Sequence, residues 1–229
     1  MNLVMLDIDG TLTQSYDYDK EIFGLAIGEV LGCAPVDADV NGYIDKTSTG
    51  VTEEAIRRIT GVNPNHGQMV EVKSNVLRRL EKMHRESPET FGEVPGARRF
   101  LERLGELDEI GIAIATGCWR EEALFKLRAS GLNVAGISMA TSDDDRKRTR
   151  IMQLAAEKAQ DFYACAGFER VVYLGDGHWD LQEAHALGYG FIGIGARIKP
   201  LIDSVNGKWH PDYRDVEAVL ASVADVLKL

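Results

Sequence analysis

The chain has few cysteines, and this shortage excludes two classes of protein. Its 229 residues include only Cys33, Cys118 and Cys165, which lie far apart. A sparse, odd set is typical of reduced thiols in a cytosolic protein, and no Cys/His pair has the spacing of zinc ligands. We therefore expect neither a disulfide scaffold nor a zinc module, and we expect a cytoplasmic location.

Positive charge and long apolar runs are also scarce. The 26 Lys and Arg face 36 Asp and Glu, a net charge of −10. Nucleic acids and anionic membranes are bound by clustered basic residues, and a bilayer span needs about 20 apolar residues. The apolar start, Met1 to Leu6, lacks the basic leader of a secretion signal. We expect no nucleic-acid partner and no membrane partner, whereas a small phosphate ester needs only a local positive pocket. The sequence does not indicate an oligomeric state.

What the chain does contain is an ordinary globular composition, 45% hydrophobic and 27% charged. Residues 15–90 show only helical periodicity. The helices predicted there are Lys20–Leu31, Thr52–Thr60 and Gln68–Arg85. This length of helical chain is enough for a small inserted domain.

From Val94 onward, short apolar strands alternate with helices. The predicted strands are Ile110–Ala115, Val134–Ile137, Val171–Leu174 and Phe191–Ile194, and the predicted helices are 95–104, Arg120–Ala129, Thr149–Gln160 and Trp179–Leu187. Such alternation indicates a parallel sheet covered on both faces. With the first strand, Asn2–Leu6, it predicts an α/β fold: a Rossmann-like, doubly wound core of residues 1–14 and 91–229, with a helical domain, 15–90, inserted after the first strand.

Two carboxylates follow the first strand, Asp7 and Asp9 in Asp-Ile-Asp-Gly-Thr-Leu-Thr. In open α/β sheets, ligands bind at this edge. Alternation places both side chains on one side of an extended segment, where they repel unless a cation or a shared proton offsets them. A calcium helix-loop-helix would need Gly and Glu where Leu12 and Tyr18 stand, so that alternative is rejected.

Two later strands end in polar residues as well. Ile114-Ala115 leads into Thr116-Gly117, where a hydroxyl and an amide could bind a phosphate oxygen. Leu174-Gly175 leads into Asp176, with Asp180 at the start of the next helix. Either motif alone also suits an ordinary turn.

A basic loop lies between these two motifs. It includes Lys147 and Arg148, followed by Thr149 as a candidate N-cap. One basic side chain there could neutralise the carboxylates and a phosphate, whereas most of the loop is typical of a solvated surface. The glycines of 188–193 fit a dinucleotide motif but precede a strand instead of a helix, so that interpretation is rejected.

The order of these motifs resembles the four signature motifs of the haloacid dehalogenase superfamily. The Asp-x-Asp-Gly-Thr-Leu-Thr stretch is the family's most recognisable signature, and Gly-Asp-x-x-x-Asp is its last. The resemblance spans the α/β core, about two thirds of the chain, and the helical insert resembles the family's α-helical cap. Within it, the segment with Lys46, Thr47, Ser48 and Thr49 resembles a substrate-facing cap segment, although Asp is more usual where Ser48 stands.

The resemblance implies roles by position. Asp7 would be the nucleophile that forms an aspartyl-phosphate, Asp9 the general acid/base, and Thr116, with Gly117 beside it, would hold a transferring oxygen. Mg²⁺ would be bound by Asp7, Asp176 and the backbone carbonyl of Asp9, with Asp180 supporting or joining them. The basic residue would be Arg148 or, second, Lys147.

The resemblance leaves several activities open. A magnesium-dependent phosphomonoester hydrolase acting on a small phosphorylated metabolite is the leading hypothesis. A sugar-phosphate mutase shares all four motifs, and a phosphonate hydrolase would need a cap lysine such as Lys46. A dehalogenase is disfavoured because Asp9 is present. A non-catalytic binding protein is also disfavoured, because unused clustered carboxylates repel one another.

Overall fold

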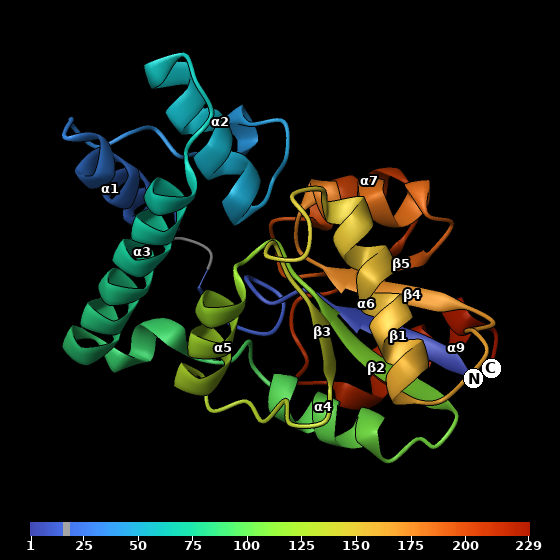
Figure 1. Cartoon of the computed structure of the whole chain (residues 1–229). Coiled ribbons are helices and arrows are strands. Elements are labelled where there is room, and N and C mark those ends of the chain that lie inside the picture. The colour runs from blue at the N-terminus through green and yellow to red at the C-terminus, as the bar shows by residue number, and fades with distance from the viewer. Residues whose placement is uncertain (16–18) are drawn as a thin grey trace.

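A single parallel sheet forms the centre of the molecule (Figure 1). The computed structural model describes residues 1–15 and 19–229, so residues 16–18 of the predicted cap lie outside the described residues. The strands are β1 Asn2–Leu6, β2 Ile110–Ala115, β3 Ser138–Ala140, β4 Val171–Gly175, β5 Gly190–Ile194 and β6 Lys208–His210. Their order is β3-β2-β1-β4-β5-β6, all parallel. The predicted fold class is confirmed, with β1 at the centre.

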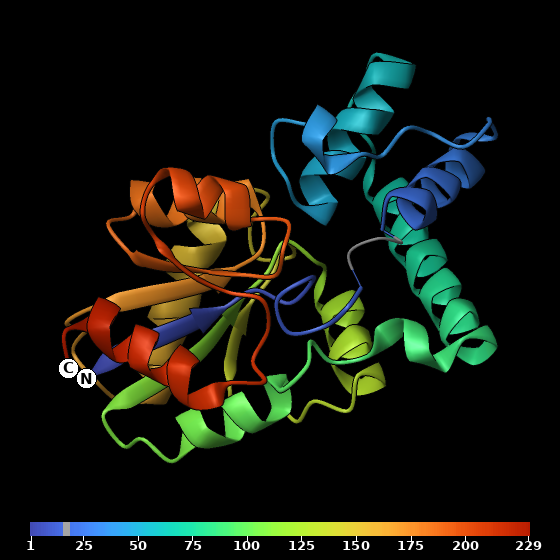
Figure 2. The same ribbon diagram turned by 180° about the vertical axis from the view of Figure 1, so that it is seen from behind.

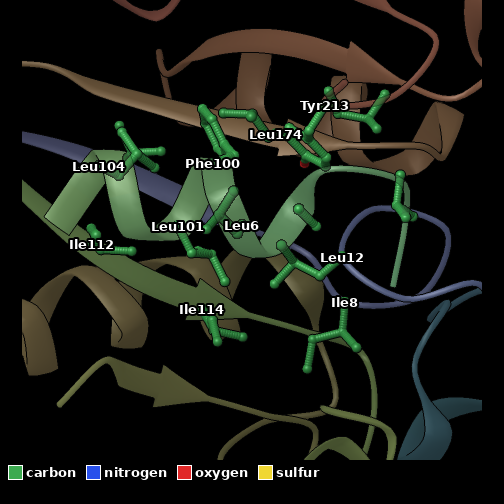
Figure 3. Close-up of a cluster of buried hydrophobic side chains, with 14 of the residues drawn as sticks. Leu6, Ile8, Leu12, Phe100, Leu101, Leu104, Ile112, Ile114, Leu174 and Tyr213 are labelled. Atoms are coloured by element: carbon green, nitrogen blue, oxygen red, sulfur yellow. The ribbon is translucent and has the colours of Figure 1, made fainter. Parts of the chain in front are cut away.

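Helices cover both faces of this sheet (Figure 2). One face is covered by α4 Ala97–Gly105, α5 Arg120–Ala129 and α9 Val216–Leu227, and the other by α6 Arg148–Phe162, α7 His178–Ala186 and α8 Lys199–Ser204. The side chains of β1 alternate between the two faces, as the strand period of two requires. Val4 and Leu6 belong to the apolar core on the face covered by α4, α5 and α9, and Leu3 belongs to the core on the opposite face. Figure 3 shows part of the former core around Phe100 and Leu174.

Two local predictions in the core are wrong. Residues 134–137 form a turn and no strand, because Gly136 takes a φ of +81° and the amide of Ile137 donates to the carbonyl of Val134. The short strand follows it, at Ser138–Ala140. Thr149 is no N-cap: helix α6 begins at Arg148 after Lys147, whose side chain makes no capping bond.

The cap consists of helices that follow β1 in the chain. They are α1 Asp19–Leu31, η2 Val40–Gly42, α2 Ser48–Thr60, α3 His66–Glu86 and η3 Pro88–Phe91. Helix α2 begins earlier than predicted because the Thr47 hydroxyl accepts a hydrogen bond from the amide of Gly50. Figures 1 and 2 show the cap at the opposite end of the molecule from the two termini.

The cap has its own apolar core, which extends across to the α/β core. Ile27, Ile56 and Leu80 are fully buried in it. Trp119, at the start of α5, packs into the same cluster, as does Phe91. The predicted boundaries at 14/15 and 90/91 stay predictions. In the described part of the chain, no helix is long and apolar enough to cross a membrane.

Candidate active site at the end of the central strand

The turn after β1 brings two strand ends together. Gly10 has a φ of +74°, a conformation that favours glycine. A Cβ at Gly10 would lie 1.8 Å from Oδ2 of Asp176, so the absence of a side chain there lets Asp176 approach the backbone. The sequence Asp-Ile-Asp-Gly therefore specifies a turn on which a carboxylate from β4 can rest.

Three buried carboxylates meet beside this turn. Asp7, Asp176 and Asp180, which we call the acidic triad, each have a carboxylate oxygen within 4.8 Å of the other two. Burial raises the pKa of Asp7 to about 7, with Asp180 and Asp9 adding to the rise and Arg148 opposing it. Burial also raises the pKa of Asp176 and of Asp180. The triad therefore favours a cation or a proton.

Two arginines offset part of this charge. Arg148 Nη1 lies 3.1 Å from Oδ1 of Asp180 and 3.5 Å from Oδ2 of Asp7, and Arg197 forms an ion pair with Asp176. The pKa of Arg148 is raised although burial opposes its charge, because Asp180 and Asp7 outweigh burial. Among the described residues, Oδ1 of Asp7 and Oδ1 of Asp176 are buried without a hydrogen-bond partner. Two buried oxygens with no donor, in a set of oxygen ligands, fit a divalent cation.

Thr116 and Gly117 complete this side of the site. The Thr116 hydroxyl accepts a hydrogen bond from the amide of Cys118, so its own proton is free to point at a ligand. A Cβ on Gly117 would lie 2.5 Å from Nη2 of Arg148, so this glycine makes room for the arginine. Lys147, in contrast, is exposed and does not line the site. The structure thus brings Arg148, and not Lys147, to Asp7.

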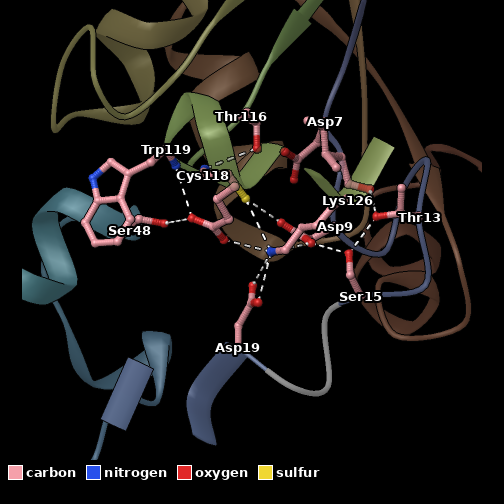
Figure 4. A network of polar contacts seen from close by, with 12 residues as sticks. Asp7, Asp9, Thr13, Ser15, Asp19, Ser48, Thr116, Cys118, Trp119 and Lys126 are labelled. Carbon is pink, nitrogen blue, oxygen red and sulfur yellow. Dashed lines mark hydrogen bonds and ion pairs between the residues drawn. The ribbon is translucent and has the colours of Figure 1, made fainter. Parts of the chain in front are cut away.

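Asp9 points into a second group of charges (Figure 4). Lys126 Nζ lies 2.8 Å from Oδ1 of Asp9, 2.9 Å from Oδ1 of Asp19 and 2.8 Å from Oε1 of Glu122. We call Lys126 and these three carboxylates the lysine cluster. Burial alone would raise the pKa of Asp9, but the charge of Lys126 and hydrogen bonds from Cys118, Lys126 and Ser15 lower it. These donors therefore stabilise the carboxylate form of Asp9.

The lysine cluster contains residues that sequence reasoning missed. Lys126 is 0% exposed, yet it lies in a helix whose sequence, Arg-Glu-Glu-Ala-Leu-Phe-Lys, is typical of a solvated surface. The only signal was the i,i+4 spacing of Glu122 and Lys126, which is common on exposed helices.

The cap segment at 46–49 lies against the core. Lys46 Nζ donates hydrogen bonds to the carbonyls of Val40, Asn41 and Tyr43. The three residues after it bond mainly to the core: the Thr47 hydroxyl donates to the carbonyl of Arg146, Ser48 Oγ donates to Glu122, and Thr49 Oγ1 donates to the carbonyl of Ser142. These three side chains therefore hold the cap on the core.

A cavity of about 240 Å³ lies between cap and core, next to these groups. Its core side is formed by Asp7, Asp9, Thr116, Gly117, Cys118, Arg148 and Trp179, and its cap side by Asp19, Lys20, Phe23, Ala38, Asp39, Val40, Asn41, Lys46, Thr47, Ser48 and Val51. Thr49 is absent from this lining. The cavity offers carboxylates and an arginine at one end and mixed apolar and polar cap residues at the other, so it suits a small polar ligand.

Comparison with known proteins agrees with this arrangement. The family model for haloacid dehalogenase-like hydrolases matches residues 1–188. The chain belongs to this family. A search of curated proteins gave no match.

Solved structures share the fold over nearly the whole chain. A hydrolase from Pseudomonas syringae has a TM-score of 0.70 at 20% identity, covering 97% of this chain and 99% of its own. A family IA, variant 3 hydrolase from Entamoeba histolytica has a TM-score of 0.70 at 15% identity, covering 100% of both chains. A putative beta-phosphoglucomutase from Bacteroides vulgatus has a TM-score of 0.68 at 16% identity, covering 100% of this chain and 91% of its own. At these identities the likeness establishes the fold.

Proposed function

We propose that the chain is a phosphomonoester hydrolase that uses Mg²⁺ and forms an aspartyl-phosphate on Asp7. One observation carries the proposal: Asp7 lies in the acidic triad, 3.5 Å from Arg148, at a cavity that Asp9 also lines. The partner implied is a small phosphorylated metabolite.

The first half of the reaction forms a covalent intermediate. A carboxylate oxygen of Asp7 attacks phosphorus, and the bond between phosphorus and the leaving-group oxygen breaks. Asp9, protonated by the water consumed in the preceding turnover, gives this proton to that oxygen, and the donors around it stabilise the carboxylate that results. Thr116 donates a hydrogen bond to an oxygen of the transferring phosphoryl group, and Arg148 offsets its charge.

The second half releases phosphate. Asp9 accepts a proton from a water molecule, the water oxygen attacks phosphorus, and the bond from phosphorus to Asp7 breaks. Both halves bring anions together. Mg²⁺ held by Asp7, Asp176 and Asp180, with the Asp9 carbonyl as a further ligand, would offset this charge.

The hydrogen bonds of Lys46 help to decide between the phosphatase and the alternative of a phosphonate hydrolase. An imine needs a free neutral amine, whereas Lys46 Nζ is engaged as a donor to three backbone carbonyls. This geometry supports substrate positioning over covalent chemistry at Lys46. A sugar-phosphate mutase would use the same acids and differs in returning the phosphoryl group to a sugar.

The test is release of inorganic phosphate from a panel of phosphorylated metabolites and from p-nitrophenyl phosphate, with Mg²⁺ or with chelator. We expect release that needs Mg²⁺ and is lost in Asp7→Asn. No release from any compound, or undiminished release by Asp7→Asn, contradicts the proposal. Dependence on a sugar bisphosphate with little free phosphate would indicate the mutase, and borohydride trapping of a substrate on Lys46 would indicate the phosphonate hydrolase.

A further inference from the structure

Lys126 is an ammonium group sealed inside the protein. Its side chain is 0% exposed, and Asp9, Asp19 and Glu122 surround its Nζ within 2.9 Å. A buried ammonium is stable only when it is paired and hydrogen-bonded, and here three carboxylates satisfy it. Asp9, Cys118 and Glu122 have the spacing of metal ligands, but Lys126 Nζ contacts all three and supplies the cation there.

The partners of Lys126 belong to different parts of the fold. Asp19 is the first residue of α1 and so of the cap, whereas Asp9 follows β1 in the core. Glu122 lies on α5 with Lys126, but its other oxygen, Oε2, accepts a hydrogen bond of 2.9 Å from Ser48, the first residue of α2. Lys126 therefore contacts the cap directly through Asp19 and indirectly through Glu122.

On its core side, Lys126 helps to fix the carboxylate of Asp9. Oδ1 of Asp9 is bonded by Lys126 and by the Ser15 hydroxyl, and Oδ2 accepts from Sγ of Cys118 at 2.7 Å. Burial raises the pKa of Cys118, which keeps this thiol protonated as a donor. Among these donors, Lys126 also bonds to both carboxylate oxygens of Asp19, the first residue of α1.

We propose that Lys126 is a positioning residue that couples the cap to Asp9. When Asp19 of the cap is in place, Lys126 is held between it and Asp9, and the Asp9 carboxylate is fixed toward the cavity. This inference rests on the proposed function of Asp9 as acid/base. It adds that a side chain from α5, which does not line the cavity, sets the orientation of Asp9.

A purely structural role for Lys126 makes a different prediction. A residue that only stabilises the core lowers activity to the same extent whether or not Asp9 is functional. A residue that acts through Asp9 has nothing left to position once Asp9 is replaced. Double-mutant cycles separate the two cases, because residues that act as a unit are non-additive.

The first experiment measures kcat for an alkyl phosphate and p-nitrophenyl phosphate in two backgrounds, wild type and Asp9→Asn. Lys126→Met should lower kcat on the alkyl phosphate about 10- to 100-fold in the wild type but less than about twofold in Asp9→Asn. Asp19→Asn, which keeps the shape of the side chain and the core contacts of Lys126, should give a smaller loss, about threefold or more, with the same dependence on Asp9.

Glu29→Gln is the matched control, because Glu29 is an acid on the same helix α1 whose ion pairs, to Arg78 and Arg79, stay inside the cap. It should leave kcat unchanged in both backgrounds. Equal losses in the two backgrounds for Lys126→Met, or Asp19→Asn behaving as Glu29→Gln, would overturn the inference. If Lys126→Met does not fold, Asp19→Asn decides alone.

The second experiment needs no activity. The Trp119 ring stacks on Phe23 of the cap at 5.3 Å, and its Nε1 donates to Thr49 of the cap at 2.8 Å, so its fluorescence reports contact between cap and core. In a protein with Trp179 and Trp209 changed to Phe, Asp19→Asn should raise quenching of Trp119 by acrylamide about twofold, and Glu29→Gln should not.

Unchanged quenching in Asp19→Asn and Lys126→Met would overturn the coupling even if the phosphatase assay succeeds. Conversely, if the wild type releases no phosphate, the proposed function fails, and a rise in quenching with Asp19→Asn still supports a contact through Lys126 between cap and core.

Discussion

Asp7 and Asp9 lie two residues apart at the end of β1, but they belong to two clusters, the acidic triad and the lysine cluster. The electrostatic surroundings of these two clusters are opposite. The acidic triad around Asp7 has arginines at its edges, raised pKa values and, among the described residues, two buried oxygens without a partner. The lysine cluster around Asp9 has an ammonium at its centre, and the pKa of Asp9 is lowered. Similar residues therefore form a site that favours an added cation and a site whose cation is built in.

The difference also separates the chemistry that each cluster suits. A carboxylate with a cation beside it and a free oxygen can attack an anionic phosphate, whereas a carboxylate held by three donors is suited to moving a proton at a fixed position. Removing either acid should therefore cause losses of different size and kind.

The largest effect is expected at the acidic triad. Asp7→Asn should abolish turnover of every phosphate ester, because the amide that replaces the carboxylate cannot form the aspartyl-phosphate of the proposed reaction. Steady-state phosphate release measures this, with circular dichroism as the control for folding. Activity near that of the wild type would remove the distinction between the two clusters.

A smaller loss is expected at the lysine cluster. Asp9→Asn should reduce kcat on the order of 10²- to 10⁴-fold, the usual contribution of a general acid/base. The loss should be smallest for aryl phosphates, whose leaving groups need little protonation. A plot of rate against leaving-group pKa for wild type and variant measures this, and parallel lines would contradict the acid role.

The sequence predicted one cluster and not the other, for a physical reason. Asp7, Thr116 and Asp176 directly follow β1, β2 and β4, and Arg148 begins α6, the helix after β3. Parallel strands end at a common edge, so topology brings these residues to one edge of the sheet. The lysine cluster depends on how the cap sits on α5, and no local pattern encodes that placement. Lys126 and Asp19 are 107 residues apart, and only tertiary packing makes them partners.

The same reasoning explains the local errors in the fold. The strands that pair with β1, namely β2 and β4, were predicted within one residue because their apolar runs are continuous. The 134–137 segment also contains apolar residues, but the positive φ of Gly136 makes the chain turn there. The edge strand β6, with the exposed Lys208, has no apolar run that would reveal it.

The next largest expected effect is on Mg²⁺ affinity, which should depend on the acidic triad and not on the lysine cluster. Asp176→Asn should weaken Mg²⁺ binding at least about tenfold, since it removes a candidate ligand whose Oδ1 is unpartnered. Glu122→Gln is the control: it removes a carboxylate from the lysine cluster and should leave the Mg²⁺ dissociation constant unchanged. Isothermal titration calorimetry measures both, and equal weakening would show that the two clusters are not separate.

The cap offers a smaller effect. Lys46→Ala should raise KM for the preferred substrate about tenfold and leave kcat nearly unchanged, because binding shared by ground and transition states affects KM alone. Small generic esters such as p-nitrophenyl phosphate, which do not reach the cap, should be little affected. A collapse of kcat on the preferred substrate would instead give Lys46 a chemical role.

The smallest effect is on stability, and its sign should differ between the clusters. The pKa of Asp7 rises from 3.8 to about 7 on folding, so folding favours its protonated form. This contribution to stability is therefore lost as pH rises from about 4 through about 7, where it levels off, and about 1 kcal/mol of it is lost between pH 6 and pH 8. Asp9 has a lowered pKa, so its contribution to stability is present at neutral pH and is lost only in acid.

In chelator, the melting temperature of the wild type should fall by about 2–4 °C from pH 6 to pH 8. Asp7→Asn should reduce this fall more than Asp9→Asn, because the charge of Asp9 contributes only a smaller part of the raised pKa of Asp7. Because a bound cation favours the ionised carboxylates, Mg²⁺ should also reduce the fall in the wild type. A melting temperature that rises over this range in chelator, or an equal fall in Asp7→Asn, would mean that Asp7 is already ionised and compensated in the folded protein.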